Sequence, residues 1–259
     1  MEHQGDNYID GMVSVIMPAY CSEDTIAVSI ESILNQSYRN WELLIYDDFS
    51  RDNTLTIAEE YSQKDDRIKI MAGKENAGVA SARNSAIRTA RGRFIAFLDS
   101  DDQWKRNKLE KQIKFLDQNG CGLCYSSYEL LSHSGNKKGR KISIFKETAS
   151  YESLLRNNYI GTLTVLIDRR KIKDEDICFS SERHEDYLLW LSYAKNGYKL
   201  MGMDESLAYY RVSANSLSGN KLKAASWRWK VYYQVEDLGF AKSIFYMFLY
   251  TYNSIRKRI

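Results

Sequence analysis

Four short β-strand patterns alternate with helical patterns along the first hundred residues. Strands are predicted at residues 13–17, 42–46, 68–71 and 94–98, and helices between them at 24–35, 54–64 and 79–89. Such alternation is typical of βαβ units, which build an α/β fold with a mostly parallel central sheet. Because ligands bind beyond the carboxyl ends of strands in sheets of this kind, the residues that follow each strand are the first candidates for a site.

The pattern changes after residue 106. Helices are expected at 106–119, 151–157, 186–196, 222–238 and 240–258, and strands at 121–131, 141–145 and 161–167, the first two separated by a polar loop at 133–140. No internal repeat or linker interrupts the chain. We therefore expect one large domain over residues 1–215, followed by a C-terminal helical region over residues 216–259.

The net charge of +3 is unevenly distributed along the chain. Residues 211–259 hold nine Lys or Arg against two Asp or Glu, whereas the other 210 residues hold 28 basic and 32 acidic side chains. The slightly acidic body argues against a nucleic-acid partner, and the basic C-terminal region favours a local anionic one. No run of 18 apolar residues is present, and residues 1–12 resemble no secretory signal, so a cytoplasmic location is expected.

Cys121 and Cys124 have the spacing of half a zinc site or of a redox pair. A second such pair, or a paired histidine motif, is absent from the sequence. Their apolar neighbours indicate a buried strand, in which free cysteine is a common small apolar residue. We favour this structural interpretation and expect reduced thiols.

Acidic side chains follow two of the predicted strands. Asp99, Asp101 and Asp102 come directly after the strand at 94–98, and Asp47 and Asp48 come directly after the strand at 42–46. One Asp would suffice to cap the following helix, whereas three crowded carboxylates repel one another unless a cation offsets them. Carboxylate oxygens suit Mg²⁺ or Mn²⁺, whose coordination shell substrate phosphates can complete. The first cluster therefore favours a metal site.

The segment after the first strand excludes two common nucleotide-binding loops. A dinucleotide-binding fold needs G-x-G-x-x-G there, and a P-loop needs G-x-x-x-x-G-K-[ST]. The sequence has Pro18-Ala-Tyr-Cys-Ser-Glu-Asp-Thr25 instead. NAD-dependent enzymes and P-loop NTPases are therefore disfavoured.

Five motifs follow one another along the chain. They are Val13-Ser-Val-Ile-Met-Pro-Ala-Tyr20, Leu44-Ile-Tyr-Asp-Asp-Phe-Ser-Arg-Asp-Asn-Thr54, Asn76-Ala-Gly-Val-Ala-Ser-Ala-Arg-Asn84, Phe97-Leu-Asp-Ser-Asp-Asp102, and His184-Glu-Asp-Tyr-Leu-Leu-Trp-Leu191 followed by Tyr210-Arg211. In this order they make the chain resemble family 2 glycosyltransferases of the GT-A fold, in particular bacterial enzymes of polysaccharide and O-antigen type. The resemblance covers roughly residues 12–215. It implies a Rossmann-like nucleotide-binding half, an acceptor-binding half and C-terminal helices.

The resemblance also assigns roles in binding a nucleotide-sugar donor. The residues that it implies in this role are Pro18, Ala19 and Tyr20 in the nucleotide pocket, Asp48 at the base, Asn76 in the loop beside it, Arg83 on the nucleotide, Asp101 towards the ribose and Arg211 near the leaving diphosphate. A UDP-sugar is the donor expected from the family.

The same resemblance makes Asp102 the ligand of a divalent metal, Mn²⁺ or Mg²⁺, and Asp186 the catalytic base. A metal and a positioned base suit displacement of a nucleoside diphosphate, because negative charge develops on the leaving group while the acceptor hydroxyl loses its proton. Direct attack would invert the anomeric centre and give a β-linkage from an α-linked donor. Without the family match, Glu185 and Asp186 would be read as acids favoured at a helix start.

The sequence departs from the family pattern at two positions. Cys21 stands where Asn is usual, and Ser213 stands where a histidine often follows the late arginine. We therefore expect Asp102 and Arg211 to carry more of the metal and diphosphate binding.

The last twenty residues combine aromatic, apolar and basic side chains at helical spacing. Phe240, Ile244, Met247, Phe248, Thr251 and Ile255 form a predicted stripe, and Arg256, Lys257 and Arg258 follow it. A basic amphipathic helix with interfacial aromatics indicates a membrane surface, whereas simple packing on the body is the alternative. A polyprenyl-diphosphate-linked glycan acceptor, and a peripheral position on the inner face of the cell membrane, would explain such a helix.

Two further functions compete with an inverting glycosyltransferase of surface polysaccharide synthesis. One is a catalytically inactive GT-A-like module that binds nucleotide or glycan at the membrane. The joint presence of Asp48, Asp101, Asp102 and Asp186 favours the enzyme. The other is a sugar-phosphate nucleotidyltransferase, which is disfavoured because its Gly-rich, Arg-containing loop after the first strand is missing.

Overall fold

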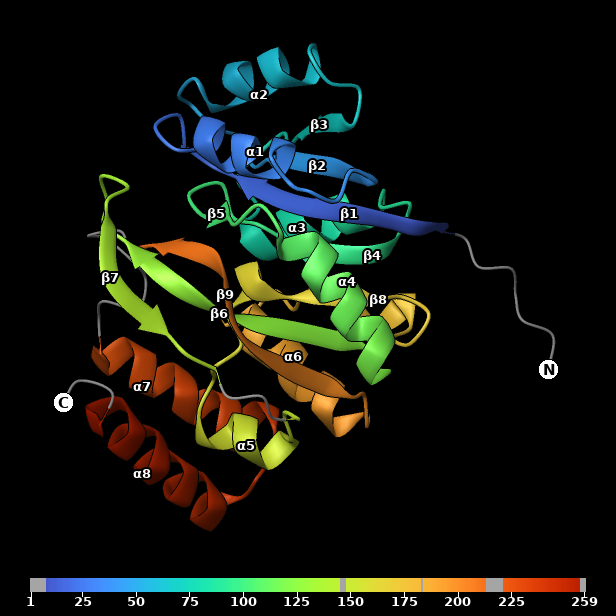
Figure 1. The fold of residues 1–259 in the computed structure, drawn as a ribbon. Helices are drawn as coiled ribbons and strands as arrows, with labels where there is room; N and C mark the ends of the chain where they lie inside the picture. Colours follow the sequence, from blue (N-terminus) through green and yellow to red (C-terminus); the bar gives the residue numbers. More distant parts are fainter. Residues whose placement is uncertain (1–7, 145–147, 183, 213–220, 257–259) are drawn as a thin grey trace.

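The structure is a computed structural model and describes residues 8–144, 148–182, 184–212 and 221–256. Its centre is a nine-stranded sheet in the order β3-β2-β1-β4-β8-β6-β9-β5, with β7 paired to β6. Helices cover both faces of this sheet (Figure 1). The predicted α/β class with a mostly parallel central sheet is confirmed.

The N-terminal half of the sheet is entirely parallel. Its elements are β1 (Ile9–Ala19), α1 (Ile26–Leu34), β2 (Trp41–Asp47), α2 (Thr54–Ser62), β3 (Ile68–Ala72), α3 (Val79–Ile87) and β4 (Gly92–Phe97). Val15 packs in the core that includes Ile30 of α1, and Ile16 packs in the opposite core with Ala86 of α3. Because helices cover both faces, these strands are apolar almost throughout, which is why the sequence predicts them well.

The second half of the sheet mixes parallel and antiparallel pairs. Its elements are β5 (Gln103–Trp104), α4 (Lys108–Asn119), β6 (Leu123–Leu131), β7 (Lys137–Ile142), α5 (Tyr151–Arg156), β8 (Leu166–Asp168), α6 (Glu185–Lys195) and β9 (Leu200–Arg211). Strand β8 runs antiparallel to both β4 and β6 and joins the two halves. Strands β6 and β9 are parallel, so they end at the same edge.

Three parts of this half differ from the sequence-based expectation. Residues 161–167 form a 3-10 turn (Thr162–Thr164) followed by the short β8, because side chains of Trp104 and Gln112 donate to the carbonyls of Leu163 and Thr164. Strand β7 begins inside the expected polar loop. The pattern does not predict β9, because polar residues 204–206 interrupt it where its register with β6 shifts.

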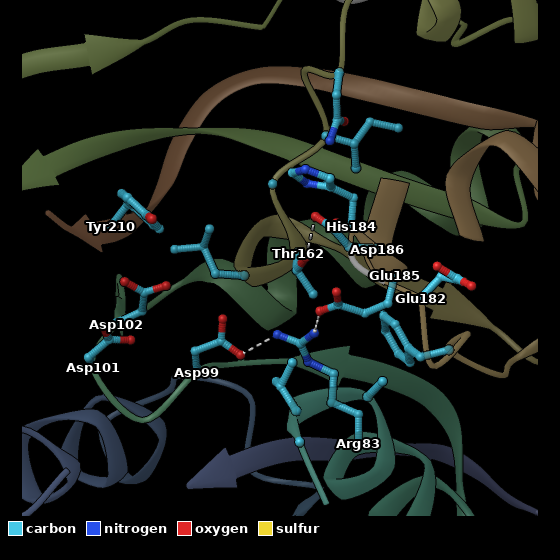
Figure 2. Close-up of a pocket in the computed structure, with 18 of the residues that line it drawn as sticks. Arg83, Asp99, Asp101, Asp102, Thr162, Glu182, His184, Glu185, Asp186 and Tyr210 are labelled. Carbon is cyan, nitrogen blue, oxygen red and sulfur yellow. Dashed lines mark hydrogen bonds and ion pairs between the residues drawn. The ribbon is translucent and has the colours of Figure 1, made fainter. Parts of the chain in front are cut away.

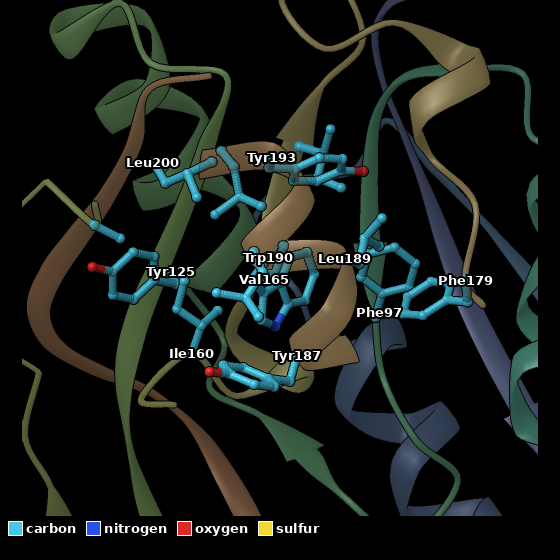
Figure 3. Packing of buried hydrophobic residues seen from close by; sticks show 14 of the residues in the cluster. Phe97, Tyr125, Ile160, Val165, Phe179, Tyr187, Leu189, Trp190, Tyr193 and Leu200 are labelled. Atoms are coloured by element: carbon cyan, nitrogen blue, oxygen red, sulfur yellow. The ribbon is translucent and has the colours of Figure 1, made fainter. Parts of the chain in front are cut away.

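The start of α6 is fixed by an aromatic core beneath it. Tyr187, Trp190 and Tyr193 of α6 are buried against the sheet (Figure 3). In the same core Phe97 of β4 meets Phe179 edge to face, with ring centroids 5.2 Å apart. Burying each such side chain contributes about 1.5–3 kcal/mol. Core packing therefore sets where the acidic residues that open α6 can lie.

The C-terminal helices pack on the body beside α5 (Figure 1). They are α7 (Lys221–Lys230), a π-helical segment (Val231–Val235) and α8 (Phe240–Arg256). Tyr232 Oη donates to the Leu155 carbonyl at 2.5 Å, and Tyr151 Oη donates to Glu236 at 2.6 Å.

The expected boundary between residues 215 and 216 lies outside the described residues, so the two-region division stays a prediction. Among the described helices, none has the length and apolar character needed to cross a bilayer.

The cysteine pair lies in the interior, as predicted. Cys124 is in β6, Cys121 precedes that strand, and both are buried with free thiols. Burial raises the pKa of both thiols. Gln112 Nε2 lies 3.4 Å from Cys124 Sγ, which gives that sulfur a partner inside the core.

Candidate active site

The carboxyl ends of β1, β2 and β4 open onto two adjoining cavities of about 880 and 1280 Å³. The smaller cavity is lined by Pro18, Ala19, Tyr20, Asp48 and Asn76, the larger one by Asp102 and Asp186, and both by Arg83, Asp101 and Arg211. All ten residues predicted for the site are thus brought together at one edge of the sheet. Asp99 and Glu185 also line both cavities, although the sequence analysis assigned them no individual role.

The end of β4 places three carboxylates in a row on one side of the larger cavity (Figure 2). Burial, followed by the negative charge of Asp99, raises the pKa of Asp101 to about 6. Burial and the charges of Asp101 and Asp99 raise the pKa of Asp102 well above its usual range. Within the described part of the chain, neither Asp101 nor Asp102 forms an ion pair. Of the three carboxylates, Asp99 is paired with Arg83, whereas the negative charge of Asp101 and Asp102 is offset only in part, by Arg211.

The donor set at the end of β4 fits a hard divalent cation. Carboxylate oxygens are the ligands that Mg²⁺ and Mn²⁺ prefer, and crowded carboxylates gain most from a nearby positive charge. In the described ranges, no three His, Cys, Asp or Glu side chains form a metal-binding group by themselves. The residues therefore fit a metal held by one or two carboxylates and completed by substrate phosphates, rather than an all-protein cage.

Arg211 closes this side of the site from the end of β9. Its backbone N–H donates to Asp102 Oδ1 at 2.8 Å, and its Nε donates to the Asp101 carbonyl at 2.8 Å. Its Nη1 donates to the carbonyl of His133 at 2.9 Å. Backbone carbonyls, and not carboxylates, thus hold the guanidinium beside the acidic cluster. Its positive charge is well placed to act on an anionic ligand.

Arg83 links the two acidic groups of the site (Figure 2). Its Nη2 lies 2.7 Å from Asp99 Oδ1 and its Nη1 lies 2.7 Å from Glu185 Oε1. The side chain is 5% exposed, and although burial lowers its pKa, the charges of Asp99 and Glu185 raise that pKa above its usual value. Arg83 therefore joins α3, the end of β4 and the start of α6 through charge-assisted hydrogen bonds.

Asp186 lies on the opposite side of the larger cavity from Asp101 and Asp102 (Figure 2). Its Oδ2 accepts a hydrogen bond from Thr162 Oγ1 at 3.2 Å, and its Oδ1 accepts one from the Tyr187 backbone N–H at 2.7 Å. His184, two positions before Asp186, occupies the N-cap position of α6 with a φ of +59°. No sequence signal marks Thr162, because its role depends on the 3-10 turn that only the folded chain forms.

Asp48 contacts the loop that leads into α3. Its two carboxylate oxygens accept the backbone N–H groups of Ala77 and Gly78, at 2.9 and 2.8 Å. Gly78 has a φ of +88°, a conformation that favours glycine. Asp48 thus shapes the loop beside the smaller cavity, and its predicted contact with a nucleotide base stays a prediction.

Cys21 occupies a strained position at the mouth of the smaller cavity. Its φ is +45°, in the left-handed region where Asn is several-fold enriched among non-glycine residues. Its backbone N–H donates to Ser50 Oγ at 2.9 Å, which ties the end of β1 to the loop after β2. This backbone conformation gives a physical reason why Asn is usual at the position of Cys21 in the family. The other departing position, Ser213, lies outside the described residues.

Known proteins resemble this chain over most of its length. Residues 14–181 match the family described as Glycosyl transferase family 2. TuaG of Bacillus subtilis (strain 168), named as a teichuronic acid biosynthesis glycosyltransferase, is 41% identical over 248 residues, which are 96% of this chain and 98% of TuaG. WfgD of Escherichia coli, named as a UDP-Glc:alpha-D-GlcNAc-diphosphoundecaprenol beta-1,3-glucosyltransferase, is 41% identical over 249 residues, which are 96% of this chain and 95% of WfgD.

A solved structure shows a similar fold. The crystal structure of Staphylococcus aureus TarS 1-349 in complex with UDP superposes with a TM-score of 0.65 at 25% identity. The match covers 86% of this chain and 65% of the TarS chain, so this chain spans about two thirds of that structure.

Proposed function

Since the chain belongs to glycosyl transferase family 2, we propose that this glycosyltransferase moves a sugar from a UDP-sugar onto a polyprenyl-diphosphate-linked glycan with inversion of the anomeric centre. The observation that carries the proposal is the pair of facing acidic groups in the larger cavity, the carboxylates after β4, of which Asp101 and Asp102 form no ion pair with a described residue, and Asp186 at the start of α6. Two chemically different carboxylate groups across one cavity suit a reaction that releases a diphosphate on one side and deprotonates a hydroxyl on the other.

The donor would occupy the smaller cavity and reach the larger one with its sugar. Pro18, Ala19 and Tyr20 would line the nucleotide pocket, with Asp48 and Asn76 beside the base. The complex of the similar TarS structure with UDP supports a uridine nucleotide here. Arg83 borders both cavities, so it would hold the donor site and the start of α6 at a fixed separation.

At the diphosphate, Asp101 would bind towards the ribose and Asp102 would hold Mn²⁺ or Mg²⁺. When bound, such an ion offsets the negative charge that develops on the leaving diphosphate. Arg211, whose guanidinium is held by backbone carbonyls beside Asp101 and Asp102, would add a second positive charge at the same place.

At the acceptor, Asp186 would take the proton from the attacking hydroxyl. Thr162 Oγ1 and the Tyr187 N–H hold its carboxylate in one orientation, as a general base within hydrogen-bond reach of its substrate requires. Because Asp186 and the β4 carboxylates lie on opposite sides of the cavity, attack from the face opposite the diphosphate is the geometry that we propose.

The acceptor class is proposed from the relatives. WfgD acts, by its name, on alpha-D-GlcNAc-diphosphoundecaprenol, and this chain matches it over nearly its full length. An acceptor of this class is anchored in a bilayer, so we also propose that the enzyme works peripherally on the inner face of the cell membrane in surface polysaccharide synthesis.

The test is a transfer assay with a panel of nucleotide sugars. Purified protein, Mn²⁺ or Mg²⁺, and a short-chain lipid-diphosphate-linked α-GlcNAc would be incubated with UDP-sugars and with GDP-mannose as a control. We expect a product from a UDP-sugar, with the β-linkage visible in the coupling constant of its anomeric proton. A wild-type protein that binds UDP-sugars yet transfers to no diphosphate-linked acceptor would instead support the inactive binding module.

A further inference from the structure

Helix α8 has two apolar faces, and only one of them packs on the protein. Ser243 is buried, and Tyr246 and Met247 pack against the main core. The ring of Tyr246 lies 5.9 Å from that of Tyr232, and the Arg228 guanidinium lies 4.7 Å from the centre of the Tyr250 ring. These contacts fix the orientation of α8, so the opposite side of the helix is turned away from the body.

The outward side of α8 and the adjoining turn are apolar. The large apolar side chains exposed there are Tyr233, Val235, Phe240, Ile244, Phe245, Phe248 and Tyr252, which we call the α8 outer face. Phe240 and Phe248 are 64% and 69% exposed. A surface helix normally presents polar residues outward, so an apolar outer face marks an interaction site. Within the predicted stripe, Met247 packs inward, whereas Phe240, Ile244 and Phe248 lie outward.

An aromatic cluster extends the α8 outer face towards α7. Trp229 stacks on Tyr233 with ring centroids 5.5 Å apart, and Phe240 meets both rings edge to face at 6.0 and 6.5 Å. Trp and Tyr are the residues enriched at the headgroup level of membranes. The cluster stands at the α7–α8 junction, where it could enter the interfacial layer together with the helix.

The charges along α8 are basic, and the two acidic residues beside the face, Glu236, which is paired with Lys195, and the exposed Asp237, lie in the turn that precedes the helix. The sequence of α8 contains no acidic residue, and it contains the exposed Lys242 and, at its C-terminal end, Arg256. Basic residues beside an anionic leaflet are attracted to it. Two basic residues follow α8 in the sequence. Apolar side chains flanked by cations match an anionic bilayer surface better than a second copy of this positively charged region.

We infer that the α8 outer face is a membrane-docking surface for anionic lipid. This inference extends the proposed function, since Ala224 and Trp227 of the neighbouring α7 line the larger cavity. A membrane held against α8 would therefore lie next to the helix that borders the acceptor side of the site. The helix would lie in the plane of the interface, because none of the described helices could span the bilayer.

The test compares full-length variants in vesicle flotation. The variant F240S/I244S/F248S removes three outward side chains, and V28S/I9S removes two exposed apolar side chains elsewhere as the matched control. On vesicles with anionic lipid, we expect wild type and control to float, and the triple variant to lose about tenfold or more in affinity. High salt should weaken wild-type binding only in part, because salt screens the charges of Lys242 and Arg256 but does not weaken the apolar contacts.

Transfer to a water-soluble acceptor analogue separates this inference from the proposed function. A triple variant that keeps this turnover and its melting temperature, yet no longer floats, supports a docking surface. Equal flotation of wild type and triple variant would overturn the inference. The inference would also be overturned if the wild type does not bind vesicles but forms a dimer, and the triple variant is monomeric. The α8 outer face would then be a subunit contact. Vesicle binding without any sugar transfer would leave docking intact and contradict the proposed function alone.

Discussion

The two acidic groups that face each other across the larger cavity differ in the partners that hold them. At the end of β4, Asp101 and Asp102 crowd together without an ion pair to a described residue, and their pKa values are raised. At the start of α6, Glu185 is paired with Arg83, and Asp186 is held by a hydroxyl and a backbone N–H. The first group needs positive charge from a ligand, whereas the second is already positioned. Within one cavity, one set of carboxylates is thus suited to binding charge and another to holding a geometry.

The largest effect is expected at the carboxylates after β4. Asp102→Asn removes the charge that would hold a divalent ion, so transfer should fall about 10³-fold while the fold survives. Isothermal titration should show that Mn²⁺ no longer strengthens donor binding. Full activity of this variant, or of wild type in excess chelator, would rule out a metal-assisted mechanism and remove the distinction between the two groups.

Asp186→Asn should lower kcat by about 10²-fold or more, because an amide cannot accept the proton of the acceptor hydroxyl. Donor affinity, measured by titration with the nucleotide sugar, should stay near that of wild type. An equal collapse of donor affinity would make Asp186 a binding residue, and the two acidic groups would then share one role.

Glu185→Gln tests the ion pair that joins the two groups. The variant keeps the shape of the side chain but removes its charge from Arg83, so the start of α6 should be held less firmly. We expect kcat to fall about tenfold with little change in the KM for donor, since the effect acts through the position of Asp186. Glu182→Gln, on the rim of the same cavity and paired with Lys230, is the matched control and should stay near wild type. A rise in donor KM at constant kcat would place Glu185 in donor binding instead.

The smallest effect is expected from Thr162→Val, which removes the hydroxyl that donates to Asp186 at nearly constant volume. One hydrogen bond of about 0.5–1.5 kcal/mol corresponds to a two- to tenfold loss in kcat. The double variant Thr162→Val/Asp186→Asn should be no slower than Asp186→Asn alone. Additive losses would show that Thr162 acts on the reaction independently of the base.

The sequence by itself was sufficient for the N-terminal half of the fold and for selecting candidate residues that line the two adjoining cavities. Strands β1 to β4 are covered on both faces, so their apolar runs identify them locally, and the residues at their carboxyl ends meet because parallel strands end at one edge. The same logic located Asp48, Asp101 and Asp102, and the order of the motifs located Asp186.

Only the tertiary structure decided how these residues hold one another. Arg83 and Glu185 are 102 positions apart, and their ion pair exists because the aromatic core under α6 sets the start of that helix against α3. Thr162 meets Asp186 through a 3-10 turn whose carbonyls are bound by distant side chains. The outward side of α8 likewise cannot be predicted from the sequence, because the helix is apolar on both faces. Periodicity predicts an apolar stripe, but only the packing in the folded chain determines which face the body covers.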